Sequence, residues 1–295
     1  MKPQSPQKAL FLSAFLLLAA CGSPEATPTP QPTPPLAPPT VCNGRSELCN
    51  RRFNEIAFPG THNAMSNYDD GWTAANQQHP LRKQLDDGIR VMLLDTHPWQ
   101  DDIYLCHSIC ELGHLLLVDG LRVIKTFMDE NPYEVITFIM EDGITTEQTV
   151  AAFETSGLLT YVYAHPQGEP WPTLYEMLTT QKRLLVTAEN ESPPPDWYQH
   201  AWDLIWDTPY SFKTVSEFSC KLNRGNQEND LFLLNHWLGT PLPSPASATT
   251  ANEYTLLSGR AKQCQMEGGQ LPNFVAVDFY NIGSLFQVVD ELNGF

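Results

Sequence analysis

Residues 131–142 read Asn-Pro-Tyr-Glu-Val-Ile-Thr-Phe-Ile-Met-Glu-Asp. The Asn-Pro pair is a turn signal, and residues 135–141 form a nearly continuous apolar run that ends in a carboxylate. Such a run is typical of a strand in a parallel sheet, because both faces of that strand are buried. Residues 115–131 before the turn and residues 146–155 after the run are amphipathic. The stretch therefore predicts a helix, a buried strand and a second helix in succession.

Six further short segments have the same apolar character. They cover residues 55–58, 89–95, 183–187, 204–206, 231–235 and 274–279. Strands that alternate with helical segments predict an α/β fold, and here a single (β/α) TIM-type barrel that can be irregular or incomplete, with one poorly formed unit. A doubly wound open sheet is the second candidate, but no glycine-rich phosphate loop follows the first strand.

Polar side chains follow the C-terminal ends of these runs. They are His62 and Asn63, Asp95 and His97, Glu141, Asn235 and His236, and Asp278. In a barrel the C-terminal strand ends meet on one face, and that face carries the active site. A polar residue at the end of a single strand often shows only that the chain meets solvent there. The recurrence of histidines and carboxylates, with few lysines or arginines, favours a site.

The first 20 residues have the pattern of a secretory signal peptide, in which Lys2 and Lys8 precede a short apolar run. The sequence Leu-Ala-Ala-Cys-Gly-Ser at 18–23 resembles a bacterial lipobox. This resemblance implies cleavage before Cys21, acylation of that cysteine and a membrane-anchored exported lipoprotein at the cell surface or periplasmic face. An ordinary signal peptide with a chance cysteine is the alternative.

Residues 21–41 are rich in proline and threonine. Proline fixes φ and removes a hydrogen-bond donor, so this segment predicts an extended, disordered tether. The barrel domain is expected to occupy residues 42–295. The formal net charge of −17 is unfavourable for nucleic acid, which requires a basic face, and we expect a monomer.

Six cysteines remain once Cys21 is set aside, and an even number in an exported chain predicts disulfides. Nearness in sequence favours the pairs Cys42–Cys49 and Cys106–Cys110, which leaves Cys220–Cys264. A zinc site is the competing interpretation, but no histidine except His107 lies at ligand spacing from a cysteine pair.

Six sequence motifs resemble the phosphatidylinositol-specific phospholipase C X-domain family, in its secreted branch of phospholipase-C-like phosphodiesterases. They are PGTHNA, QLDDGIRVMLLDTH, DDIYLCHS, NPYEVITFIMED, CKLNRG and PNFVAVDFYN, in the family's order from about residue 48 to the C-terminus. The resemblance implies cleavage of phospholipid or inositol phosphodiesters through a 1,2-cyclic phosphate. It makes His62 the base that deprotonates the inositol 2-hydroxyl and His107 the acid that protonates the leaving oxygen, and imidazole suits both tasks.

The resemblance also implies a way to neutralise the phosphate. Metal-free members carry an arginine where this chain has His97. Calcium-dependent members use an asparagine and three acids, of which Asn63, Asp95 and Glu141 match three, while Leu93 occupies the fourth position. With Asp278 as a further oxygen ligand, the sequence predicts a Ca²⁺ site, and an anionic substrate needs such a cation among carboxylates.

The remaining predicted substrate contacts are His97, Arg224, His236 and Tyr280. Two other functions stay open. A glycerophosphodiesterase or sphingomyelinase-D-like enzyme on the same barrel carries a Glu-x-Asp pair where this chain has Leu93 and Asp95. A non-catalytic surface lipoprotein that binds glycan or lipid needs no acid–base pair. Head group and acyl chain cannot be deduced from the sequence.

Overall fold

The computed structural model describes residue 1 and residues 37–239 and 242–295. The predicted signal peptide, Cys21 and nearly all of the tether lie outside the described residues. Residues Pro38–Phe295 form one compact unit. No helix among the described residues combines the length and apolar character needed to cross a bilayer.

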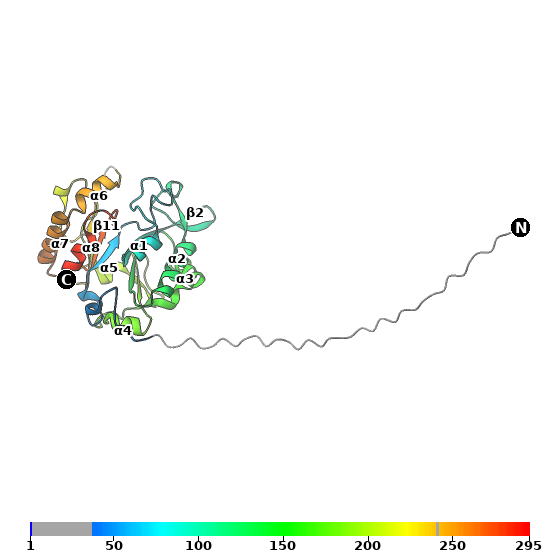
Figure 1. Ribbon diagram of the computed structural model, residues 1–295, viewed down its shortest axis with the longest axis horizontal. Helices are drawn as coiled ribbons and strands as arrows, with labels where there is room; N and C mark the ends of the chain where they lie inside the picture. The colour runs from blue at the N-terminus through cyan, green and yellow to red at the C-terminus, as the bar shows by residue number, and fades with distance from the viewer. Residues whose placement is uncertain (2–36, 240–241) are drawn as a thin grey trace. The chain divides into compact units, whose positions relative to one another are not determined.

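Parallel strands form the centre of this unit, and helices lie around them (Figure 1). The main strands are β1 (Phe58–Thr61), β2 (Val91–Trp99), β5 (Ile136–Asp142), β7 (Leu184–Ala188), β9 (Ile205–Asp207), β10 (Leu231–His236) and β11 (Phe274–Val277). The shorter strands are β3 (Asp102–Leu105), β4 (Leu115–Leu116), β6 (Val162–Tyr163) and β8 (Tyr198–His200). The order along the sheet is β6-β7-β5-β2-β1-β11-β10-β9, and β8 also pairs with β7.

The sheet curls but does not close by hydrogen bonds, because no described strand joins β9 to β6 or β8. It is therefore an incomplete TIM-type barrel, as predicted. Strand β6 departs from the chain order, since it lies outside β7 while β7 pairs directly with β5. Strands β3 and β4 are antiparallel additions to β2 that carry the sequence DDIYLCHS and its following loop.

The helices cover the outer face of the sheet, with α2 and α3 on one side and α7 and α8 on the other (Figure 1). Their bounds are α1 Leu81–Asp86, α2 Leu117–Glu130, α3 Thr146–Ser156, α4 Leu174–Thr179, α5 Ala201–Leu204, α6 Pro245–Ala251, α7 Tyr254–Gly268 and α8 Leu285–Leu292. Five 3₁₀ turns lie at Ser46–Leu48, Phe53–Glu55, Cys110–Leu112, Leu158–Tyr161 and Val215–Glu217. The N-cap Thr145, with Gln148 three residues later, forms a capping box that fixes the start of α3.

Two hydrophobic cores follow from the alternation of side chains along each strand. In β2, Met92 and Leu94 belong to the core under the helices, whereas Val91 and Leu93 belong to the core inside the barrel. The same alternation holds in β10, where Leu231 and Leu233 face inward. The position of a residue in its strand therefore decides whether its side chain reaches the barrel interior.

The first strand differs from the expected one. Residues 53–55 form a 3₁₀ turn, and β1 begins at Phe58 rather than at residue 55. The Pro-Gly pair at 59–60 is a turn signal in sequence, yet it lies inside this central strand. A Cβ at Gly60 would lie 3.2 Å from the Val91 Cβ and 3.3 Å from the Val275 carbonyl oxygen, so glycine permits the close approach of both neighbouring strands.

All three predicted disulfides are confirmed: Cys42–Cys49, Cys106–Cys110 and Cys220–Cys264. Cys42–Cys49 closes a short loop near the N-terminal end of the domain, and Cys220–Cys264 ties the loop after β9 to helix α7. The second lies between β3 and β4, directly around His107.

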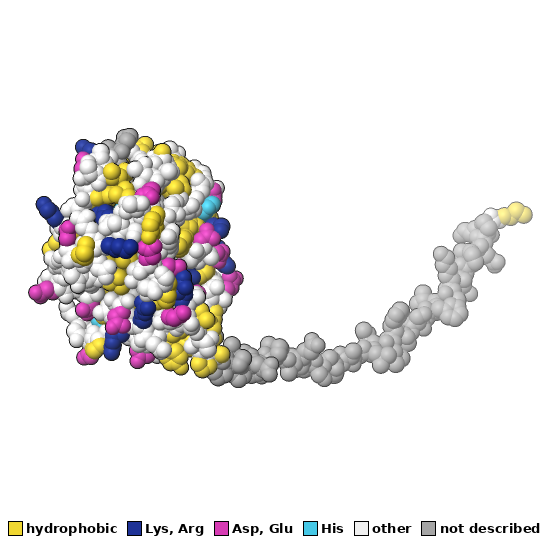
Figure 2. Space-filling view, turned by 60° about the vertical axis from the view of Figure 1, so that its left-hand side comes forward, with side chains coloured by type: hydrophobic (Ala, Val, Ile, Leu, Met, Phe, Trp, Pro, Cys, Tyr) yellow, Lys and Arg dark blue, Asp and Glu magenta, His cyan; other side chains and the backbone are white. Residues whose placement is uncertain are grey.

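Charged side chains are distributed over the surface without a dominant basic region on the face seen in Figure 2, where Lys and Arg lie among acidic side chains. Several lysines and arginines form ion pairs with an acid one turn further along the same helix. Arg82 pairs with Asp86 in α1, and Lys125 pairs with Asp129 in α2. Exposed pairs of this kind contribute at most about 1 kcal/mol to stability.

Candidate active site

The inward-facing residues at the C-terminal ends of the strands line one pocket. Its lining is His62, Asn63, Leu93, Asp95, Ile139, Glu141, Glu189, Tyr210, Arg224, Asn235 and Trp237. These residues come from the C-terminal parts of β1, β2, β5, β7, β9 and β10 and from the loops that follow them. The pocket therefore occupies the face of a barrel that carries active sites.

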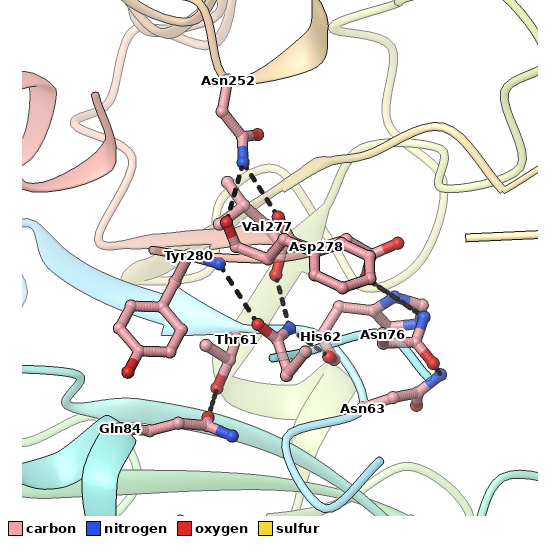
Figure 3. Close-up of polar contacts among 11 residues, drawn as sticks. Thr61, His62, Asn63, Asn76, Gln84, Asn252, Val277, Asp278 and Tyr280 are labelled. Atoms are coloured by element: carbon pink, nitrogen blue, oxygen red, sulfur yellow. Dashed lines mark hydrogen bonds and ion pairs between the residues drawn. The ribbon is translucent and has the colours of Figure 1, made fainter. Parts of the chain in front are cut away.

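His62 is held by three side chains. Its Nδ1 lies 2.9 Å from Asp278 Oδ1 and 3.3 Å from Asn76 Nδ2, which also donates to the same Asp278 oxygen over 3.1 Å (Figure 3). Its ring stacks on Trp237 with centroids 3.8 Å apart. Because the carboxylate accepts from Nδ1–H, the other ring nitrogen, Nε2, is the free basic atom. An imidazole fixed in this tautomer is suited to take a proton.

Asn63 contacts both predicted catalytic histidines. One end of its amide group lies 3.1 Å from both Asp95 carboxylate oxygens, and the other end lies 3.2 Å from His62 Nε2 and 3.3 Å from the ring nitrogens of His107. His62 lines this pocket, whereas His107 lines a neighbouring one. The two imidazole centroids are 6.3 Å apart with planes at 72°. Two imidazoles that approach the same end of one amide can act on the two oxygens of one phosphodiester.

Burial of the ring lowers the pKa of His107 to about 4, and the nearby His62 and His97 add to this effect. The outer part of His107 is exposed, so water screens part of the shift. The imidazole is thus neutral in the free protein at neutral pH. An anion that binds next to the ring favours its protonated form.

Three carboxylates line the pocket together: Asp95, Glu141 and Glu189. Asp95 is only 4% exposed, and its burial together with the charges of Glu141 and Glu189 raises its pKa well above the usual range. No lysine or arginine pairs with Asp95 within the described residues. Burial also raises the pKa of Glu189 to about 7, although Arg224 opposes this change. This part of the pocket is therefore deficient in positive charge.

Arg224 supplies the positive charge that the pocket does contain. Its guanidinium pairs with the fully buried Asp207 at 2.6 Å and with Glu189 at 2.6 Å, and it lies over the rings of Trp202 and Tyr210. Two acids and two aromatic rings hold the planar group in one orientation. Arg224 lines the pocket, where the sequence predicts that it contacts the substrate.

Two predicted substrate contacts are wrong. His236 occupies the outward-facing position after Phe232 and Leu234, so it is fully buried beneath the helices, where Nε2 contacts the Ala251 carbonyl at 2.7 Å and Nδ1 contacts Arg260. Tyr280 is 2% exposed, and its hydroxyl donates to Asp87 at the end of α1. Neither side chain lines the pocket.

Asp278 has a contact that the sequence did not predict. It does not line the pocket with Asp95 and Glu141, and its Oδ1 accepts from His62 and Asn76. Asp278 is thus a partner of His62 in the structure, and its role as a metal ligand stays a prediction. His97 lies beyond Asp95 on the same side of β2, beside Gly143, and does not line the pocket.

The sequence reasoning missed Glu189, Asp207 and Asn76, and it gave no contact between Trp237 and His62. Glu189 follows Leu185 and Thr187 at alternate positions, and Asp207 follows Ile205, so extension of each predicted strand by one or two residues indicates both acids. Asn76 lies in the long segment between β1 and α1, and Trp237 directly follows β10. No periodic signal marks these two residues.

The oxygen atoms of Asn63, Asp95 and Glu141 match the ligand preference of Ca²⁺. No group of three or more His, Cys, Asp or Glu side chains in residues 37–239 and 242–295 converges tightly enough to form a metal site as it stands. Asn63 contributes an amide, however, and a half-turn of that amide directs its oxygen toward Asp95. The unpaired, buried Asp95 with its acidic neighbours fits a cation.

The sequence profile of the family PI-PLC X 1 matches residues 48–293. An uncharacterized secreted protein of Arthroderma benhamiae is 32% identical over 91% of this chain, which spans 66% of that protein. A PI-PLC X domain-containing protein of the same fungus is 30% identical, with 88% of this chain and 92% of that protein covered. A PI-PLC X domain-containing protein of Arabidopsis thaliana is 29% identical, and 62% of its length is covered.

Solved structures show the same architecture. Phosphatidylinositol-specific phospholipase C from Staphylococcus aureus aligns with a TM-score of 0.57 and 14% identity over 82% of this chain and 94% of that chain. PLC21 from L. pealei aligns with a TM-score of 0.51 and 14% identity over 81% of this chain and 35% of that chain. At this identity the likeness concerns the fold alone.

An incomplete α/β barrel with paired histidines at the C-terminal ends of its strands is a barrel of the phospholipase C type. The chain belongs to the PI-PLC X domain family. Fold and family together support a phosphodiesterase of the phospholipase C kind.

Proposed function

We propose that this protein is a phosphoric diester hydrolase that cleaves phosphatidylinositol-type phosphodiesters by acid–base catalysis with His62 and His107. The observation that carries the proposal is that the two imidazoles approach the same end of the Asn63 amide, with one of them oriented by Asp278. A domain that only binds lipid or glycan requires neither the pair nor the orienting carboxylate.

The reaction follows from the free atoms of the two rings. His62 Nε2 removes the proton of the inositol 2-hydroxyl, and the resulting oxygen attacks phosphorus. The bond from phosphorus to the diacylglycerol oxygen breaks, and His107 transfers a proton to that oxygen. The products are diacylglycerol and an inositol 1,2-cyclic phosphate, which water opens when the two histidines exchange roles. The carboxylate of Asp278 stabilises the imidazolium form of His62 in the first step.

Two groups of residues support the charge balance. Arg224 lies in the pocket in a fixed orientation, and a guanidinium of this kind binds phosphoryl oxygens or sugar hydroxyls. Asn63, Asp95 and Glu141 would hold a Ca²⁺ ion, which supplies positive charge to the phosphoryl oxygens. Glu189 lies beside these acids and pairs with Arg224, so it links the two groups.

Direct assay of a substrate panel tests the proposed function. Phosphatidylinositol, lysophosphatidylinositol, glycosylated inositol lipids and sphingomyelin are incubated with the domain, with and without Ca²⁺. We expect release of the head group from the inositol lipids, which carry a hydroxyl beside the phosphodiester, and none from sphingomyelin. Binding of vesicles without turnover of any substrate would instead support the non-catalytic lipoprotein. Turnover of sphingomyelin or glycerophosphodiesters alone would support the other barrel enzymes.

We further propose that the protein is exported and anchored in a membrane by a lipid on Cys21. The support is the leader and lipobox of residues 1–23 and the relative that is named a secreted protein. Lipid substrates lie in such a membrane, so an anchored enzyme meets them at high effective concentration.

Replacement of Cys21 by Ser is expected to move the protein from the detergent phase to the aqueous phase in Triton partitioning, because two acyl chains are lost. Ser23→Ala serves as the control, since it alters the same segment but leaves the acylated cysteine. An unchanged detergent fraction for Cys21→Ser would show that another element provides the anchor.

A further inference from the structure

The two catalytic histidines are held in different ways. His62 has a carboxylate, an amide and a stacked indole around its ring. The ring nitrogens of His107 contact only the amide of Asn63 among the described side chains, and no carboxylate or carbonyl oxygen fixes the second ring nitrogen there. The position of His107 must therefore depend on the backbone that carries it.

That backbone is a five-residue ring closed by the disulfide Cys106–Cys110, with His107 as its second residue. The first cysteine is fully buried, and its N–H donates to the Asp95 carbonyl over 3.3 Å, which connects the ring to β2. The second cysteine is 4% exposed and begins the 3₁₀ turn Cys110–Leu112. The two cysteines of the ring are thus buried, while His107, Ser108 and Ile109 between them are exposed.

The segment after the ring is fixed against the loop that follows β1. Thr73 N–H donates to the Leu112 carbonyl over 2.8 Å. A Cβ on Gly113, whose φ is +159°, would lie 2.2 Å from the Trp72 ring. Inside the ring, the Ile109 N–H donates to the His107 carbonyl, and just after the ring the Leu112 N–H donates to the Ile109 carbonyl. With both flanks of the ring attached, the disulfide is the covalent constraint that limits the conformations of the residues between them.

The location of this disulfide matches a local role better than a global one. Its two cysteines are only four positions apart in sequence, against seven and 44 positions for Cys42–Cys49 and Cys220–Cys264. Stabilisation of a fold by a disulfide rises with the length of the closed loop, so this bridge contributes least of the three to global stability. Its main effect is therefore to restrict the conformations of the residues inside the ring, rather than to stabilise the whole fold.

We propose that Cys106 and Cys110 are positioning residues whose disulfide holds His107 in place for protonation of the leaving oxygen. This inference rests on the proposed function, in which His107 is the acid. The bridge fixes the acid in the way that Asp278 fixes the base. A displacement of about 1 Å at a catalytic group costs on the order of 10²-fold in rate. A protein that lacks the Cys106–Cys110 disulfide is therefore expected to lose most of the acid catalysis by His107.

The test compares two inositol phosphodiesters that differ in the leaving group. An alkyl ester needs a proton on its leaving oxygen, whereas an aryl ester such as the nitrophenyl ester departs without one. The variant Cys106→Ala/Cys110→Ala is expected to lose about 10–10²-fold in kcat/KM on the alkyl ester and less than about threefold on the aryl ester. On the alkyl ester, addition of His107→Ala to this variant is expected to lower the rate no further than His107→Ala alone.

The variant Cys42→Ala/Cys49→Ala is the matched control, because it also removes a short disulfide but one that does not enclose His107. It is expected to leave the alkyl-to-aryl ratio of rates unchanged. Equal losses on both esters for Cys106→Ala/Cys110→Ala, or no loss on either, would overturn the positioning role. Partial reduction of the wild-type protein, with the opened bridge identified by thiol labelling and mass spectrometry, gives the same comparison if the double variant does not fold.

Failure of the inference differs from failure of the proposed function. If His107→Ala shows the alkyl-selective loss and Cys106→Ala/Cys110→Ala does not, His107 is the acid and only the role of the disulfide is refuted. If His107→Ala itself shows no selectivity, or the wild type cleaves neither ester, both proposals are refuted together.

Discussion

Replacement of His62 by Ala is expected to lower kcat/KM for an inositol phosphodiester by about 10²–10⁴-fold, which corresponds to about 2.7–5.4 kcal/mol of transition-state stabilisation. The loss is expected because Nε2 is the free basic atom of a ring that Asp278 and Trp237 hold in place. Replacement of His107 is expected to cause a similar loss on an alkyl ester. Steady-state kinetics on the purified variants measures both.

The leaving group separates the two roles. An aryl ester is expected to restore most of the rate of His107→Ala but not that of His62→Ala, since only the acid becomes dispensable. The combined loss of the double variant is expected to be smaller than the product of the single losses, because both residues act on one reaction. His200→Ala, at a partly exposed histidine paired with Asp203, is the control and should retain full activity. Full activity of both site variants on every substrate would leave the binding-module function in place.

Removal of Ca²⁺ is expected to have the second largest effect. EDTA should abolish most activity, and Asp95→Asn and Glu141→Gln should raise the Ca²⁺ concentration required for half-maximal rate. The reason is electrostatic, because Asp95, Glu141 and Glu189 crowd one wall with a single arginine already paired to two acids. An anionic phosphodiester is repelled from such a wall unless a cation intervenes.

Titration of activity with Ca²⁺ in a chelating buffer measures this effect. The exposed Asp101, at the turn between β2 and β3, provides the control variant Asp101→Asn, which should leave the Ca²⁺ requirement unchanged. Isothermal titration of Ca²⁺ into wild type and Asp95→Asn gives a readout that does not depend on turnover. Full activity in EDTA would make Arg224, which lines the pocket, the better candidate for phosphate binding.

The barrel could be predicted from sequence because its strands are buried on both faces. The apolar run at 135–141 predicted a buried strand, and the observed β5 spans Ile136–Asp142. The short strands β6 and β8 were not predicted, because two or three residues give no periodic signal. The offset of β1 arose from Pro59 and Gly60, which normally mark turns but here allow two strands to approach closely.

The site was predictable in part for a related reason. Polar residues at strand ends identified His62, Asp95 and Glu141, and these line one pocket. Polarity alone does not tell which face of the strand a residue occupies, however. His236 follows the inward-facing Asn235 by one position and therefore points to the opposite side of the sheet, where Arg260 contacts it.

Partners that come from distant loops lay beyond the sequence reasoning. Asp278 was assigned to a metal because its type and strand-end position suit one, and only the fold shows its contact with His62. Trp237 stacks on the same ring although it gives no sequence signal beyond its apolar character. Sequence patterns indicate which groups reach the site, whereas tertiary packing decides which of them touch.

The identity of the first phosphorus-containing product tests the central claim most directly. Attack by the 2-hydroxyl with His62 as base gives a five-membered cyclic phosphate before any water enters the product. Time-resolved ³¹P NMR of phosphatidylinositol cleavage by the wild-type protein is therefore expected to show inositol 1,2-cyclic phosphate first and the acyclic monophosphate later. Appearance of the acyclic phosphate from the start, with ¹⁸O from labelled water in its first molecules, would contradict the account.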